Sequence, residues 1–219
     1  MGAFTIPTPP RIREPLWLVG LDLGQRRDYT ALAVVQRTDT LRPSGELRVA
    51  PTREARYAVK QLDRIRGVSY ETVAERMVAL LKRPELAKAQ LAVDGTGVGV
   101  AVLDMLEARG LRPERVTITG GLEATSHGRE HHVPKRDLAS AVAVLLDAER
   151  LLIDEALPLA PALTGELENF RVKLSPTGHA SFEAGTDWRE NEHDDLVLAV
   201  ALAVWLGEQP SRELWKGRS

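Results

Sequence analysis

Three β-rich segments open the chain, and a regular alternation of helical and strand-like segments follows them. Residues 16–23 (LWLVGLDL) form a continuous apolar run that is typical of a buried strand. Residues 30–36 (TALAVVQ) follow after a short polar link, which predicts a β-hairpin. A third strand is expected within residues 48–62, after a turn at Pro43–Gly45. This order restricts the chain to sheets that begin with an antiparallel meander.

The remaining pattern predicts helices packed on that sheet. A helix is expected after Ser69, followed by a strand at 90–93, a helix from the GTGVG turn to Arg109 and a strand at 115–119. A polar loop at 120–133 leads to a helix from Pro134 and a short apolar segment at 151–154. The chain then continues with a helix within 158–170, a hairpin that pairs 170–174 with 180–184, and a last helix from about His193. The predicted fold is α/β, with a mixed sheet of about five core strands flanked by helices and an extra hairpin before the last helix.

Length and composition indicate one domain. The chain has 219 residues, of which 43% are hydrophobic, and it contains no Cys, which excludes thiol chemistry and Cys-ligated zinc. With 29 basic and 31 acidic residues, a generic basic DNA-coating protein is not expected. No signal peptide is visible and the longest apolar run, residues 196–206, is too short to cross a bilayer, so a soluble cytoplasmic protein is expected. We assign residues 1–15 to a proline-rich tail or linker, 16–207 to the domain, and 208–219 to a C-terminal tail.

Two aspartates end predicted buried strands. Asp22 lies in LWLVGLDLG, where an ionised carboxylate is costly unless it is paired or binds a cation. Asp94 ends the next buried strand of the alternation, immediately before the GTGVG turn, and strand carboxyl ends are where open α/β sheets place their sites. The glycines do not fit a dinucleotide loop, because position 102 is Val. Turn capping is the alternative role for either residue.

A third acidic group precedes the longest apolar run. His193, Asp194 and Asp195 lie just before that run, and the helix dipole or a cap explains one acid there. Carboxylates at the two strand ends and before this apolar run would supply only oxygen ligands, which suit two Mg²⁺ or Mn²⁺ ions. Two ions about 3.5–4 Å apart clamp the attacking and leaving oxygens of a phosphodiester displacement.

The motifs GLDLG…DYTALAVV, VDGTGVG, VPKRDL and HDDLVLAVALA resemble the C-terminal nuclease domain of phage terminase large subunits over residues 16–207. The resemblance implies a ribonuclease H-like fold and a metal-dependent endonuclease that cuts concatemeric double-stranded viral DNA during packaging. Little sequence preference is expected, because no base-reading element is evident. The same resemblance implies that Asp22, Asp94 and the pair Asp194–Asp195 are catalytic metal ligands, although it does not say which of the pair faces the metals. His193 is expected to orient a carboxylate or a water, or to act as an ordinary polar cap.

The resemblance also implies partners and a location. They are the portal, the small terminase subunit and a packaging ATPase, in the cytoplasm of a bacterial host. No Walker loop occurs in the sequence, so the ATPase is expected to be separate or missing, as in an isolated domain, a separately encoded nuclease or a prophage remnant.

Basic residues in two places are candidates for phosphate contacts. Arg129, Lys135 and Arg136 flank the His-rich segment and are the predicted DNA-binding residues. A second basic stretch at 53–66 is equally well explained as a solvated face. His127, His131 and His132 could instead bind a transition metal.

Two other functions compete with the nuclease. An actin-like or sugar-kinase ATPase also begins with a D-L-G hairpin, but that class needs two such domains to enclose ATP. A catalytically inactive DNA-binding module is the other alternative, and metal-dependent cleavage discriminates it from the nuclease.

Overall fold

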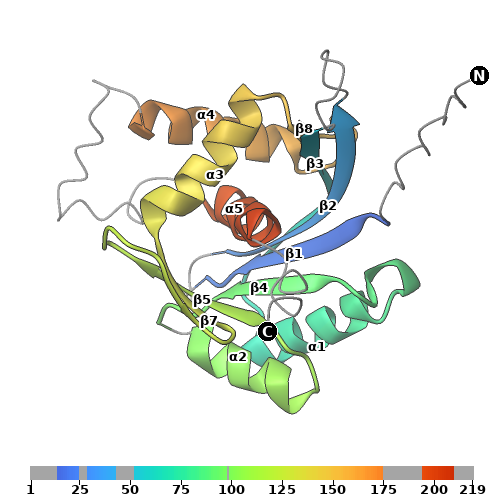
Figure 1. The fold of residues 1–219 in the computed structure, drawn as a ribbon. Coiled ribbons are helices and arrows are strands. Elements are labelled where there is room, and N and C mark those ends of the chain that lie inside the picture. The colour runs from blue at the N-terminus through green and yellow to red at the C-terminus, as the bar shows by residue number, and fades with distance from the viewer. Residues whose placement is uncertain (1–13, 25–28, 43–51, 98, 175–193, 210–219) are drawn as a thin grey trace, which may run out of the picture.

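A single mixed sheet forms the centre of the computed structural model, which describes residues 14–24, 29–42, 52–97, 99–174 and 194–209 (Figure 1). The strands are β1 (Leu16–Asp22), β2 (Thr30–Arg42), β3 (Thr52–Ile65), β4 (Gln90–Asp94), β5 (Glu114–Thr119), β6 (Thr125–His127), β7 (Glu130–Pro134) and β8 (Leu151–Ile153). The helices are α1 (Tyr70–Leu81), a short 3₁₀ turn η1 (Pro84–Leu86), α2 (Gly99–Ala108), α3 (Lys135–Asp147), α4 (Ala160–Leu174) and α5 (Asp195–Glu208).

The strand order is β6-β7-β5-β4-β1-β2-β3-β8. The strands β1, β2 and β3 form the predicted antiparallel meander, while β1–β4, β4–β5 and β5–β7 pair in parallel. Parallel crossovers bring the carboxyl ends of β1, β4, β5 and β7 to one edge of the sheet. We call this the carboxyl edge; β2 begins there and β3 ends there.

Helices cover both faces of the sheet (Figure 1). The helices α1 and α2 pack on one face against apolar side chains such as Val19, Leu21 and Val93. The helices α3, α4 and α5 cover the other face, where Leu18, Ala92 and the apolar residues of α5 share one core. Almost every side chain of α5 is buried, which explains its uninterrupted apolar sequence.

Local signals in the sequence account for the starts and ends of several elements. Ser69 caps α1, where its side chain accepts a hydrogen bond from the Thr72 amide at 3.2 Å. Gly110 follows α2 with φ of +83°, a conformation that favours Gly. Among the described residues, no helix combines the length and the apolar character needed to span a membrane.

Three sequence predictions about the elements need correction. Residues 170–174 are the last turn of α4 rather than a strand, so the expected hairpin is wrong there; its second half, residues 180–184, lies outside the described residues. The segment 120–133 is not a plain loop, because it contains the β6–β7 hairpin. The described sheet has eight strands instead of about five, since β6, β7 and β8 extend it at both sides.

The segments at both ends of the domain stay predictions. Most of the proposed N-terminal tail and C-terminal tail lies outside the described residues. The last helix continues to Glu208, one residue beyond the domain boundary expected from the sequence.

Candidate active site

The side chains of Asp22 and Asp94 lie next to each other at the carboxyl edge. Leu21 is paired with Val93 in the parallel β1–β4 ladder, so the following residues, Asp22 and Asp94, are neighbours about one strand spacing, ~4.8 Å, apart. Leu21 and Val93 point into the α1–α2 core. Because side chains alternate along a strand, both aspartates face α5. They are 7% and 3% exposed.

The turn after Asp94 brings its backbone close to the start of α2. The Thr96 amide donates to Asp94 Oδ1 at 2.8 Å, so one carboxylate oxygen has the turn-capping role considered from the sequence. A Cβ on Gly99 would lie 2.0 Å from the Asp94 carbonyl oxygen, which explains a glycine at that position. The glycine-rich turn thus allows the backbone after β4 to approach the start of α2 closely.

The start of α5 lies over these two strands. A Cβ on Gly20 would lie 1.9 Å from the Ala199 carbonyl oxygen, so α5 rests directly on β1. Asp195 lies about one helical turn before Ala199, and Asp22 lies two residues after Gly20. The rise over one helical turn is similar to the length of two strand residues, so the two acids lie at about the same level. Asp195 is therefore the acid of the Asp194–Asp195 pair on the helix face that lies toward the end of β1.

Asp194 has a different position from its neighbour. It is the N-cap residue of α5, 9% exposed, and its side chain makes no capping hydrogen bond to the helix. The cap is instead provided by Glu166 of α4, whose Oε2 accepts hydrogen bonds from the amides of Leu196 and Val197 at 3.0 and 3.1 Å. The capping role expected for an acid just before α5 thus belongs to a residue far away in the sequence.

Glu166 is a site residue that the sequence reading missed. It is 7% exposed and its Oε1 accepts a hydrogen bond from Arg64 Nη2. Burial raises the pKa of Glu166 to about 7, while the Arg64 guanidinium and the Val197 amide act in the opposite direction. The available signal was an acid beside Leu163 and Leu167, which form the buried stripe of α4.

Arg64 belongs to the same edge because of an irregularity in β3. Val35 pairs with Val59 but Val34 pairs with Gln61, which leaves Lys60 as an extra bulged residue. Beyond the bulge Arg64 pairs with Ala31, which in turn pairs with Asp22. The side chain of Arg64 therefore faces α5, where Nη2 lies 3.5 Å from Asp195 Oδ2. This basic residue is mostly buried, which is unlike the solvated face considered for the stretch 53–66.

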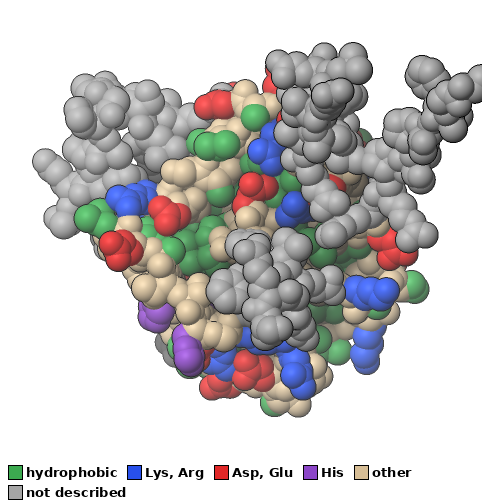
Figure 2. Space-filling view, in the orientation of Figure 1, with side chains coloured by type: hydrophobic (Ala, Val, Ile, Leu, Met, Phe, Trp, Pro, Cys, Tyr) green, Lys and Arg blue, Asp and Glu red, His purple; other side chains and the backbone are tan. Residues whose placement is uncertain are grey.

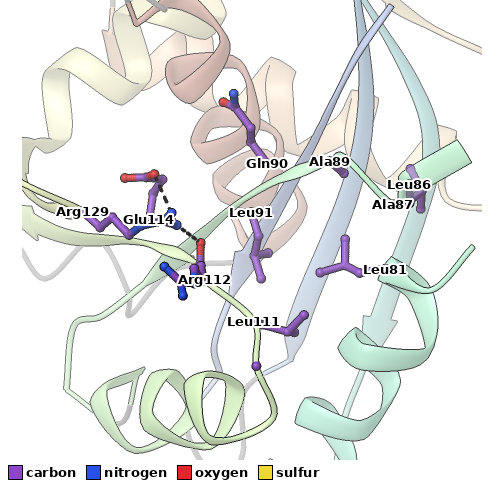
Figure 3. A pocket seen from close by; sticks show the side chains of 11 residues that line it. Leu81, Leu86, Ala87, Ala89, Gln90, Leu91, Leu111, Arg112, Glu114 and Arg129 are labelled. Carbon is purple, nitrogen blue, oxygen red and sulfur yellow. Dashed lines mark hydrogen bonds and ion pairs between the residues drawn. The ribbon is translucent and has the colours of Figure 1, made fainter. Parts of the chain in front are cut away.

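The predicted DNA-binding residues separate into two groups. Lys135 and Arg136 start α3 directly after β7 and so lie at the carboxyl edge; Arg136 donates to the Leu122 carbonyl and lies 3.5 Å from Asp137. Arg129 lies in the β6–β7 turn at the opposite edge, where the sheet's parallel strands begin. There it donates to the Arg112 carbonyl and lies 3.9 Å from Glu114 (Figure 3). The structure does not bring Arg129 together with the acidic residues.

The three histidines do not converge. His131 is buried, with its ring nitrogens 2.8 Å from Ser126 Oγ and 2.8 Å from Glu114 Oε2. His132 follows it in β7 and faces the other side of the strand, and His127 pairs with Glu130 and shares that other side. His193, the other candidate histidine, lies outside the described residues.

The side chains of the described residues form no group of three or more His, Asp or Glu close enough to hold a metal ion. Asp22 and Asp94 are two adjacent carboxylates, and Asp195 is directed toward Arg64. The donor set is nevertheless all oxygen, since the chain has no Cys, and that chemistry fits Mg²⁺ or Mn²⁺.

The sheet combines an antiparallel three-stranded meander with parallel strands, and the buried helix α5 starts at the acidic strand ends and packs along β1. This is the arrangement of ribonuclease H-like α/β proteins. The comparisons with known proteins identify the group within that class. The model of the terminase RNaseH-like domain matches residues 19–205, and the chain belongs to this family. No curated protein matches the chain.

Solved structures of large terminases are similar to the chain. The HK97 bacteriophage large terminase is 14% identical, with a TM-score of 0.50 over 90% of this chain and 40% of that one, so this chain spans less than half of its length. The large terminase nuclease from thermophilic phage G20c is 19% identical, with a TM-score of 0.48 over 87% and 81% of the two chains. The g2p nuclease domain from bacteriophage SPP1, solved with bound Mn, is 14% identical, with a TM-score of 0.40 over 70% and 68%. At these identities the likeness concerns the fold.

Proposed function

We propose that the chain is a divalent-metal-dependent endonuclease that cuts double-stranded DNA during phage genome packaging. The observation that carries the proposal is the adjacency of two buried aspartates, Asp22 and Asp94, beneath the acidic start of α5. Two acids so close together on an apolar face repel each other, and a bound cation relieves that cost. Family membership makes DNA the fitting substrate.

In this proposal Asp22, Asp94 and Asp195 hold Mg²⁺ or Mn²⁺, with Asp194 as the alternative ligand from α5. Two such ions would supply an activated water and stabilise the departing 3′ oxygen. The protein's own part is to fix the carboxylates on rigid strands and a buried helix, which keeps the ligands preorganised. His193 would orient one of these carboxylates or a water.

The DNA backbone would approach along the carboxyl edge, where Lys135 and Arg136 can meet phosphates without reading sequence. On the side of the molecule that Figure 2 shows, the basic and acidic side chains of the described residues are interspersed. Arg129 would contact DNA only if the duplex also reached the opposite edge. A packaging ATPase, the portal and the small terminase subunit would direct the cut, in the cytoplasm of a bacterial host.

Cleavage of supercoiled plasmid tests the proposal. We expect nicking and linearisation with Mn²⁺ or Mg²⁺ and none with EDTA. The near-isosteric changes Asp22→Asn and Asp94→Asn should lower the rate by about 10³-fold, because metal ions contribute several kcal/mol of transition-state stabilisation. Asp104→Asn is the matched control, since that carboxylate on α2 is exposed and paired with Arg115.

Calorimetric titration with Mn²⁺ adds a readout that does not depend on DNA. The wild type and Asp104→Asn should release or absorb heat on binding, and Asp22→Asn and Asp94→Asn should not. Plasmid that stays intact with the wild type, or equal cutting by the aspartate variants, would rule out the proposed activity.

A further inference from the structure

One buried ion pair joins three separate elements at the carboxyl edge. Arg64 at the end of β3 and Glu166 of α4 form this pair, and their side chains are 15% and 8% exposed. Each partner also reaches the first turn of α5. Glu166 accepts from two amides of that turn, and Arg64 lies 3.5 Å from the carboxylate of Asp195.

The contact of Glu166 fixes how α5 begins. The first amides of a helix need acceptors, and the N-cap Asp194 provides none from its side chain. Glu166 provides them from a position 30 residues earlier in the chain. The start of α5 is therefore held by α4 as well as by β1. These contacts fix where the acidic residues of the first turn lie.

The contact of Arg64 balances charge in the acidic site. Paired strand residues place Arg64, Ala31 and Asp22 in one row on the face covered by α5. Asp195 lies above that row. The small side chain of Ala31 separates the cation from Asp22, so Arg64 contacts the acid from the helix and not the acids from the strands. An arginine in this place lowers the repulsion that Asp195 meets near Asp22 and Asp94.

We propose that Arg64 and Glu166 are positioning residues for cation binding, which fix the start of α5, and Asp195 with it, at the strand ends that carry Asp22 and Asp94. This inference rests on the proposed function and deepens it. An ion pair that served stability alone would need contacts only within itself, and apolar side chains of similar size could replace it. Here both partners contact the first turn of α5, so their loss should change the metal affinity as well as the stability.

The test compares Glu166→Gln and Arg64→Met with the wild-type chain. Glu166→Gln keeps an oxygen for the two amides but removes the charge that holds Arg64, and Arg64→Lys is a second, more conservative arginine variant. Glu168→Gln is the matched control, because Glu168 is an exposed carboxylate on the same helix. Calorimetric Mn²⁺ titration without DNA and the Mn²⁺ dependence of plasmid cleavage are both measured, together with urea unfolding.

We expect Glu166→Gln and Arg64→Met to weaken Mn²⁺ binding about 10- to 100-fold, the usual effect of removing a group that orients a ligand. Cleavage should recover in part at high Mn²⁺ concentration, Arg64→Lys should lose less than Arg64→Met, and Glu168→Gln should match the wild type. A purely structural role would lower stability while the Mn²⁺ midpoint of the folded protein stayed unchanged, and that result would overturn the inference. A wild type that neither binds Mn²⁺ nor cuts DNA would instead overturn the proposed function, and the inference with it.

Discussion

Each of the two edges of the sheet pairs a carboxylate with a basic side chain, but the two pairs have different surroundings. At the carboxyl edge Glu166 and Arg64 contact the start of α5, and three further acids, Asp22, Asp94 and Asp195, lie on the same face. At the opposite edge Glu114 is engaged by His131, which also bonds to Ser126. That second network ties neighbouring strands together.

The difference separates the proposed functional cluster from a local structural network. At the opposite edge the imidazole of His131 lies between the Glu114 carboxylate and the Ser126 hydroxyl, and Arg129 lies 3.9 Å from the same carboxylate. At the carboxyl edge Arg64 meets Glu166 and Asp195, and Asp22 and Asp94 lie beside them where parallel strands end. The gathering of several acids at strand ends is what makes this edge the candidate site, since the burial of one charged group by itself does not make a site.

The largest effect is expected where α5 rests on the carboxyl edge. Gly20→Ala would place a Cβ 1.9 Å from the Ala199 carbonyl oxygen, so the helix must move away from β1. We expect a loss of about 3 kcal/mol in the free energy of unfolding, the upper range for an overpacked core, together with weaker cleavage in the folded protein. Urea unfolding and plasmid cleavage measure the two effects.

Gly120→Ala is the control for that change, because nothing lies within 4 Å of a Cβ built there. Its stability should remain within about 0.5 kcal/mol of the wild type. If Gly20→Ala unfolded at the same urea concentration as Gly120→Ala, the close packing of α5 on β1 would be disproved.

An intermediate effect, on stability alone, is expected at the opposite edge. His131→Ala removes the bond to Glu114 and the edge-on contact with Trp205, whose ring centre lies 5.3 Å away. We expect a loss of about 1–3 kcal/mol, typical of a buried polar group that loses its partner. The rate of plasmid cleavage by the folded protein should not change.

Ser126→Ala serves as the milder comparison at that edge, because the serine is exposed and contributes only one bond to the network. A fall in cleavage rate with His131→Ala in protein that is still fully folded would contradict the division of roles between the two edges.

The smallest effect concerns the other end of α5, and it depends on pH. Tyr57 is fully buried, and burial followed by its hydrogen bond to Glu208 raises the pKa of its hydroxyl above the ordinary value of about 10. The folded state therefore keeps a proton that the unfolded state loses, so stability falls as the pH rises above about 10. Tyr57→Phe should cost about 1 kcal/mol at neutral pH and reduce that alkaline slope.

Unfolding curves from pH 8 to pH 11 measure this dependence. Tyr70→Phe, at the start of α1, is the control and should retain the slope of the wild type. An unchanged slope in Tyr57→Phe would show that other groups cause the alkaline loss of stability.

Patterns that depend on neighbouring residues were predicted well. The apolar runs identified β1, β4 and α5. Asp22 and Asp94 lie at the ends of the two strands and the Asp194–Asp195 pair lies at the start of the helix, which places all of them at one edge. These predictions succeed because strand burial and parallel crossovers follow from local sequence and general topology. The metal roles of these acids remain predictions.

What the sequence missed depends on contacts between distant segments. The chain at 170–174 alternates in a way that resembles a strand, but it continues α4, because a helix already begun adds residues at little cost. The role of Glu166 could not be predicted, since its partners are Arg64, about 100 residues before it, and amides 30 residues after it. The short strands β6 and β7 contain His and Glu rather than apolar runs, and they form by pairing with the edge of β5.

The bulge at Lys60 gives β3 one residue more than its partner strand needs. If one residue between 60 and 63 were deleted, the strand could straighten and Arg64 would still lie opposite Ala31. In a regular strand of the present length, by contrast, Asp63 would take the place of Arg64 and face Asp195. The strand can thus lose one residue here and keep a cation beside the acidic site, while a slip of the register by one residue would replace that cation with an anion.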